Sequence, residues 1–87
     1  MRFIWDDLNI AHVARHQLTP AQVDAVLDAA DVGWSVLEDG RILIEGSVEP
    51  GMVRVVVVAV ADDAGALYVI TAHRIHHKRR RSPPWNR

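Results

Sequence analysis

Residues 52–61 form an almost uninterrupted run of apolar and mostly β-branched side chains, in which Arg54 is the single charged residue. Such a run is typical of a strand in the interior of a sheet, and we expect both of its faces to be covered. Shorter apolar segments separated by turn-forming residues predict further strands at residues 3–5, 34–37, 41–48 and 66–72. Within 41–48, Gly46 indicates a bulge or a close approach of another backbone.

Two short helices are predicted ahead of these strands. Asp6 or Asp7 can accept hydrogen bonds from the first amides of a helix that continues to about residue 16. In that helix we expect the core-facing stripe to be Ile10, Val13 and Ala14, with Trp5 and Ile10 closing a hydrophobic staple.

The second helix has the clearer start signal. Thr19 and Gln22 have the spacing of a capping box, and Pro20 stands at the first helical position. An apolar face at i, i+3, i+4 and i+7 follows, and the helix is expected to end near residues 31–33; the face consists of Val23, Val26, Leu27 and Ala30.

Together these elements predict an α+β fold, in which β-α-α is followed by an antiparallel β-sheet meander and a basic C-terminal helix or tail. A chain of 87 residues has room for a single domain, which we assign to residues 1–81, with 82–87 as a basic tail. The longest wholly apolar run is residues 55–61, far too short to span a bilayer, and no signal peptide is recognisable. We therefore expect a cytoplasmic protein without a membrane partner.

The net charge of −1 conceals a strong segregation. Residues 1–72 carry all eleven acidic side chains and a net charge of −7, whereas residues 73–87 carry no acid and a net charge of +6. A basic block of this kind is typical of a contact with nucleic acid or with an acidic protein. The alternative is a solvated basic tail that only aids solubility.

The basic block also contains the residue types that metal-free RNA cleavage requires. That reaction needs a base for the ribose 2′-hydroxyl, an acid for the leaving 5′-oxygen and cations around the phosphate. Histidine suits the proton transfers near neutral pH, and arginine suits the phosphate. If residues 73–81 are helical, His73, His76 and His77 share one face.

We accordingly predict His73 as acid or base and either His76 or His77 as the second proton carrier. Arg41, Arg54 and Arg74 are the predicted phosphate ligands. The alternative is a basic patch that binds phosphate without cutting RNA.

We expect neither a cofactor nor a metal. His12 and His16 lie four residues apart on the first helix, but Val13 stands where the glutamate of an H-E-x-x-H motif would be. A zinc or nickel site made of His73, His76 and His77 is the other metal hypothesis. Trp5 and Trp34 are predicted to be core residues and Trp85 to be exposed.

Residues 5–20 read W-D-x-x-N-x-x-H-x-x-R-H-x-x-T-P and resemble the opening signature of the BrnT family of bacterial toxins. Gly40-Arg41, Gly46, Arg54 and the segment 68–72 follow in the order found in that family. The resemblance implies a RelE-like fold and the toxin of a type II toxin–antitoxin module. It also implies a metal-independent endoribonuclease that a cognate antitoxin neutralises, with operator DNA contacted only through the antitoxin.

The resemblance makes Arg15 and His16 candidate edges of an RNA groove, beside the basic residues Lys78, Arg79, Arg80 and Arg81. Two departures support a rival hypothesis, a toxin-like protein that binds nucleic acid or an antitoxin without catalysis. His73 stands where the family usually has arginine, and Arg79 stands near an expected acidic residue. A third hypothesis is a structural partner protein whose tail docks on an acidic surface.

Overall fold

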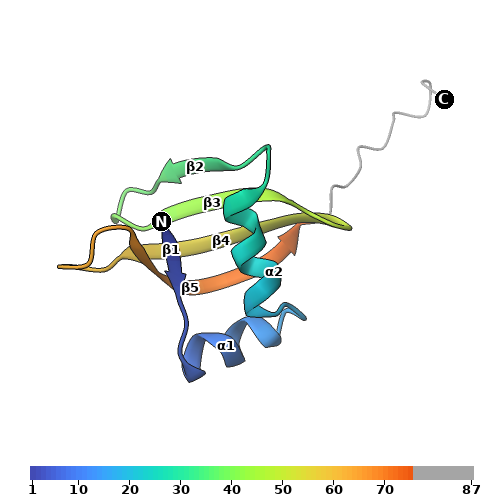
Figure 1. The fold of residues 1–87 in the computed structure, drawn as a ribbon, viewed down its shortest axis with the longest axis horizontal. Coiled ribbons are helices and arrows are strands. Elements are labelled where there is room, and N and C mark those ends of the chain that lie inside the picture. The colour runs from blue at the N-terminus through green and yellow to red at the C-terminus, as the bar shows by residue number, and fades with distance from the viewer. Residues whose placement is uncertain (76–87) are drawn as a thin grey trace.

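The computed structural model describes residues 1–75 and confirms the α+β class. Within these residues a five-stranded sheet is packed on one side by two short helices and a 3₁₀ turn (Figure 1). The elements in chain order are β1 (Arg2–Ile4), α1 (Asp7–Ala14), α2 (Pro20–Asp24), the 3₁₀ helix η1 (Ala25–Asp28), β2 (Gly33–Val36), β3 (Ile42–Val48), β4 (Gly51–Ala59) and β5 (Ala66–Ile75).

The sheet has the strand order β1-β5-β4-β3-β2. Strands β2 to β5 form the predicted antiparallel meander, and β1 adds to the free edge of β5 in parallel. Two of the connecting turns contain glycine with positive φ, +91° at Gly40 and +85° at Gly65, a conformation that side chains with a Cβ rarely adopt. The chain reverses at both turns, and β4 is the middle strand of the five-stranded sheet.

Both predicted helix starts are confirmed. Asp6 caps α1 and Thr19 caps α2, and each cap is a reciprocal capping box, closed by Asn9 and Gln22 respectively. Both helices are short. Helix α1 ends at Ala14, and α2 gives way to the 3₁₀ helix η1 at Ala25.

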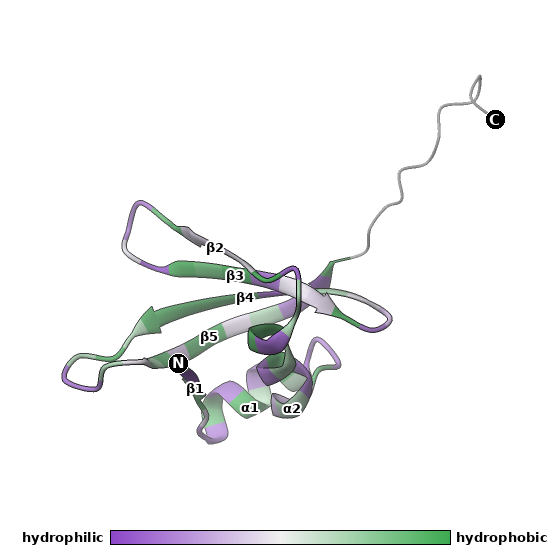
Figure 2. Cartoon of the chain, turned by 45° about the horizontal axis from the view of Figure 1, so that its top comes forward, coloured by the Kyte–Doolittle hydropathy of each residue, from purple (hydrophilic) through white to green (hydrophobic). Residues whose placement is uncertain are grey.

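The core lies between the helices and one face of the sheet. Val53, Val55 and Val57 alternate along β4 and are fully buried beneath Val13, Val23 and Val26 of the helical layer. The prediction that both faces of this strand are covered is wrong. Arg54, Val56 and Val58 point the other way and are only half-buried, because both helices of the described chain lie on the same side of the sheet (Figure 2).

Three other expectations need correction. On α1 the buried residues are Asn9 and Val13, whereas Ile10 and Ala14 are exposed, so the stripe is rotated toward Asn9. Trp34 is 44% exposed because it lies on the edge strand β2, which the core does not reach. Residues 73–75 belong to β5 and not to a helix, because their pairing with β4 continues to Ile75.

The predicted close approach at Gly46 is confirmed. A Cβ built there would lie 2.8 Å from the Cβ of Ala29 and 3.1 Å from the carbonyl oxygen of Val26. Glycine thus lets η1 pack directly on β3. Among the described residues, no helix is both long and apolar enough to cross a membrane.

We predict that Gly46→Ala lowers the free energy of unfolding by about 1–3 kcal/mol, because the added methyl group overpacks the contact with η1. Urea unfolding followed by circular dichroism measures the change. Gly33→Ala is the matched control, since a Cβ at Gly33 meets nothing within 4 Å. Equal losses in the two variants would contradict the packing argument.

Candidate active site

A row of three polar side chains crosses the uncovered face of the sheet. Glu45 of β3 is the register partner of Arg54 on β4, and Arg54 is the register partner of His73 on β5. Directly opposed residues in antiparallel strands project to the same face, so the three side chains are neighbours. Arg54 Nε donates to Glu45 Oε2 at 2.5 Å, which holds the guanidinium beside His73.

Helix α1 runs along the edge of β5 that the short β1 leaves free. The side chain of Asn9 fixes it there, because its Nδ2 donates to the carbonyl oxygens of Ile4 at 2.9 Å and Val69 at 3.0 Å. A second side-chain contact binds α1 to β5 one turn later, where His12 Nε2 lies 3.0 Å from Thr71 Oγ1. These contacts bring the histidines of α1 to the histidine of β5.

Three imidazoles consequently lie in succession. The ring centroids of His12 and His16 are 5.7 Å apart, and those of His16 and His73 are 6.1 Å apart. His16 lies in the turn after α1, which closes through Gln17 at a φ of +62° and returns the chain to the core at Leu18. The row Glu45-Arg54-His73 is thus extended past the sheet edge by His16 and His12.

A cavity of about 260 Å³ opens at the junction of sheet edge and turn, and we call it the histidine cleft. His16, Gln17, His73 and Arg74 line it. The two imidazoles therefore face a common space, with Arg74 on its β5 side.

The surroundings of His73 lower its pKa below the usual 6.5. Burial is the main cause, and the positive charges of Arg54 and His16 act in the same direction, against a smaller opposite effect of Glu45. Near neutral pH the imidazole of His73 is therefore mostly neutral and able to accept a proton.

The structure brings together only part of the predicted site. Arg54, His73, Arg74, His16 and Arg15 all lie at or near the cleft, although Arg74 is partly engaged, since its Nη1 donates to the carbonyl oxygen of Val48 at 2.7 Å.

Arg41 does not join them. It pairs with Asp39 at the start of β3, four residues and about 13 Å along the strand from Glu45. The remaining predicted site residues lie outside the described residues; they are His76, His77, Lys78, Arg79, Arg80 and Arg81.

Sequence reasoning missed Glu45 and assigned His12 no role in RNA binding or cleavage. A sequence signal for Glu45 was present, because it is an isolated acid in an apolar strand, as Arg54 is an isolated base in the next. Their pairing depends on strand register, which the sequence pattern did not specify. Within residues 1–75, no group of three or more histidine or acidic side chains is arranged to hold a metal ion.

Comparison with known proteins gave no match, whether against family models, curated proteins or solved structures.

We predict that His73 titrates below pH 6.5 in an NMR titration of the imidazole resonances. Arg54→Gln should raise this pKa, because a repelling positive charge is removed, but leave it below 6.5, because burial remains the main cause. Glu45→Gln should lower it further, because a stabilising negative charge is lost. Shifts of the same sign in both variants would contradict the charge arrangement described for the row.

Proposed function

We propose that this protein is a metal-independent endoribonuclease that cleaves RNA in the histidine cleft. The observation that carries the proposal is the pair His16 and His73, whose rings lie 6.1 Å apart and line one cavity together with Arg74. Two imidazoles on either side of a phosphate can supply both proton transfers of RNA cleavage.

In the proposed reaction, neutral His73 takes the proton of a ribose 2′-hydroxyl, and the resulting oxygen attacks the adjacent phosphorus. The bond from phosphorus to the 5′-oxygen of the next nucleotide breaks, and His16 in its imidazolium form gives that oxygen a proton. The products are a 2′,3′-cyclic phosphate and a free 5′-hydroxyl. His73 suits the role of base because its pKa is lowered, chiefly by burial.

The arginines supply charge to the pentacoordinate phosphate. Arg54 lies directly opposite His73 on the neighbouring strand. Its Nε donates to Glu45 Oε2 at 2.5 Å, and this hydrogen bond fixes the guanidinium. Glu45 acts in this scheme as a positioning residue. Arg74 adds a second guanidinium at the β5 side of the cleft, held by the carbonyl of Val48.

The motif in residues 5–20 is the basis on which we propose a biological role for this reaction. Its resemblance to BrnT toxins supports a RelE-like member of a type II toxin–antitoxin module, and the α+β arrangement with a four-stranded meander is compatible with that assignment. The partner would be a cognate antitoxin whose acidic surface covers the basic cleft, with operator DNA contacted only through it.

We predict that the purified protein cleaves a defined single-stranded RNA in excess EDTA, leaving 2′,3′-cyclic phosphate ends. His73→Asn should reduce the rate by about 10²-fold or more, the range of a lost general base. In the wild-type protein the rate should rise with pH through the lowered pKa of His73, so the acidic limb of the profile lies below pH 6.5. Gel analysis of end-labelled RNA and mass spectrometry of the 3′ ends measure both effects.

Arg54→Gln and Arg41→Gln form a matched pair, because both remove an arginine that is ion-paired to a carboxylate. Only Arg54→Gln should impair cleavage. RNA that stays intact with folded, antitoxin-free protein, in the presence and absence of bacterial ribosomes, would contradict the proposal. Salt-dependent RNA binding in that case would favour the non-catalytic alternative.

A further inference from the structure

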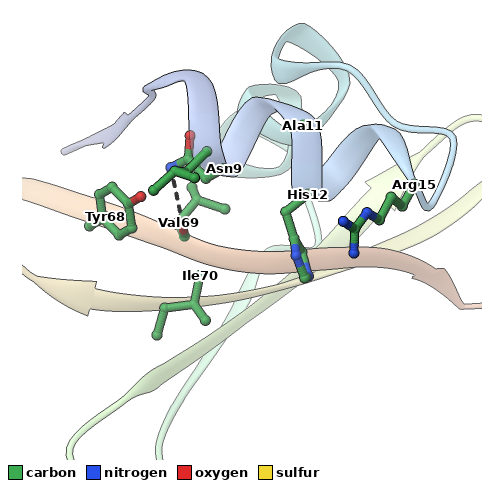
Figure 3. A pocket seen from close by; sticks show the side chains of 8 residues that line it. Asn9, Ala11, His12, Arg15, Tyr68, Val69 and Ile70 are labelled. Atoms are coloured by element: carbon green, nitrogen blue, oxygen red, sulfur yellow. Dashed lines mark hydrogen bonds between the residues drawn. The ribbon is translucent and has the colours of Figure 1, made fainter.

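A second cavity, of about 340 Å³, lies between α1 and β5 next to the histidine cleft (Figure 3). Leu8, Ala11, His12 and Arg15 form its helical wall, and the buried Asn9 completes the lining together with Tyr68, Val69 and Ile70 of β5. We call it the α1–β5 slot. Its volume lies at the lower end of the range typical of small-molecule sites.

The helical wall is a face of α1 that the core does not use. Its four residues have the spacing i, i+3, i+4 and i+7, whereas the core-facing residues of α1 are Asn9 and Val13. Leu8 is 77% exposed, although it is a large apolar residue on a well-capped helix. The slot therefore exposes apolar surface that nothing in residues 1–75 covers.

Two polar side chains of the slot, Tyr68 and His12, already make contacts within the protein. The hydroxyl of Tyr68 is occupied, because it donates to Asp6 at 2.9 Å. The ring of His12 is fixed by its contact with Thr71 and lies 5.7 Å from His16, which lines the histidine cleft. His12 and His16 therefore join the two cavities.

Arg15 supplies the positive charge of the slot. Its guanidinium lies beside the ring of His12 (Figure 3), and among residues 1–75 it makes neither an ion pair nor a side-chain hydrogen bond. A guanidinium offers a planar fork of donors that suits two acceptors on one edge of a flat ligand.

We infer that the α1–β5 slot binds the guanine base of the RNA whose phosphate occupies the histidine cleft. The inference rests on the proposed function for the identity of the polymer. Apolar walls and a fixed imidazole suit a flat aromatic ring. Of the two purines, which offer the larger ring to the apolar walls, guanine presents two adjacent acceptors, O6 and N7, to an arginine fork, whereas adenine pairs N7 with a donor. His12 lines the slot and the neighbouring His16 lines the histidine cleft. A base in the slot therefore lies next to the scissile phosphate in the cleft.

Binding of the four nucleoside 3′-monophosphates, measured by calorimetry, tests the inference without any cleavage. We expect guanosine 3′-monophosphate to bind about tenfold more tightly than the other three. Arg15→Met should abolish this preference, whereas Arg2→Met, which removes an exposed arginine elsewhere, should preserve it.

A second variant blocks the slot sterically. Ala11→Phe should weaken binding of guanosine 3′-monophosphate about tenfold while leaving the affinity for inorganic phosphate unchanged. Ala14→Phe is the matched control, because Ala14 is also an exposed alanine of α1 but does not line the slot. Both substituted positions are exposed, so the fold should be retained.

Equal affinity for the four nucleotides, or an Ala11→Phe variant that binds like wild type, would overturn the inference. Failure of every nucleotide to bind folded protein would also overturn it and leave the slot to a protein partner. Selective guanosine binding by a protein that cleaves no RNA would support the slot while contradicting the proposed reaction. Cleavage without guanine preference and without any effect of Ala11→Phe would reject the slot alone.

Discussion

The arrangement of the whole site depends on the buried side chain of Asn9. Its oxygen and backbone amide complete the capping box with Asp6, and its Nδ2 donates to both Ile4 and Val69. The side chain is 3% exposed, so its removal would leave the carbonyl oxygen of Val69 without its partner away from water, at about 1–3 kcal/mol for an unsatisfied group. One residue thus fixes the start of α1, the end of β1 and the edge of β5 relative to each other, and with them the histidines of α1 and β5.

The second constraint is that the helical layer covers one face of the sheet. The two helices, of eight and five residues, lie on a single face of the described sheet, and the fully buried valines of β4 all lie on that face. On the other face the polar row Glu45-Arg54-His73 stays accessible to solvent, although its members come from three central strands. The position of His73 at the boundary between this face and α1 explains its partial burial and hence its lowered pKa. A small fold thereby presents a neutral imidazole on a rigid strand.

The sequence predicted the features that depend on local chemistry. The caps at Asp6 and Thr19 and the glycine turns follow from residues near each other in the chain, and all are present. The close approach at Gly46 is a tertiary contact, but the glycine within a strand predicted it, and it is also present. The errors concern features set by tertiary contacts. Exposure of Ile10 depends on how Asn9 rotates α1, and the extension of β5 to Ile75 depends on pairing with β4, which overrides the helical spacing of residues 73–77. Of the candidate site, the sequence supplied His73 and Arg54, but their apposition to His16 and Glu45 required the strand register and the docking of α1.

The central claim is that RNA is bound where α1 meets β5. Chemical-shift mapping tests it most directly, with isotopically labelled protein and a 2′-O-methyl oligoribonucleotide that lacks the attacking hydroxyl and cannot be cleaved. We predict that the largest shifts occur at His16, His73 and Arg74, which line the histidine cleft, and at Arg54, the register partner of His73. Large shifts confined to the exposed edge strand around Trp34 and Val36 would contradict it, because β2 lies at the opposite side of the strand order from β5 and contributes nothing to the proposed chemistry.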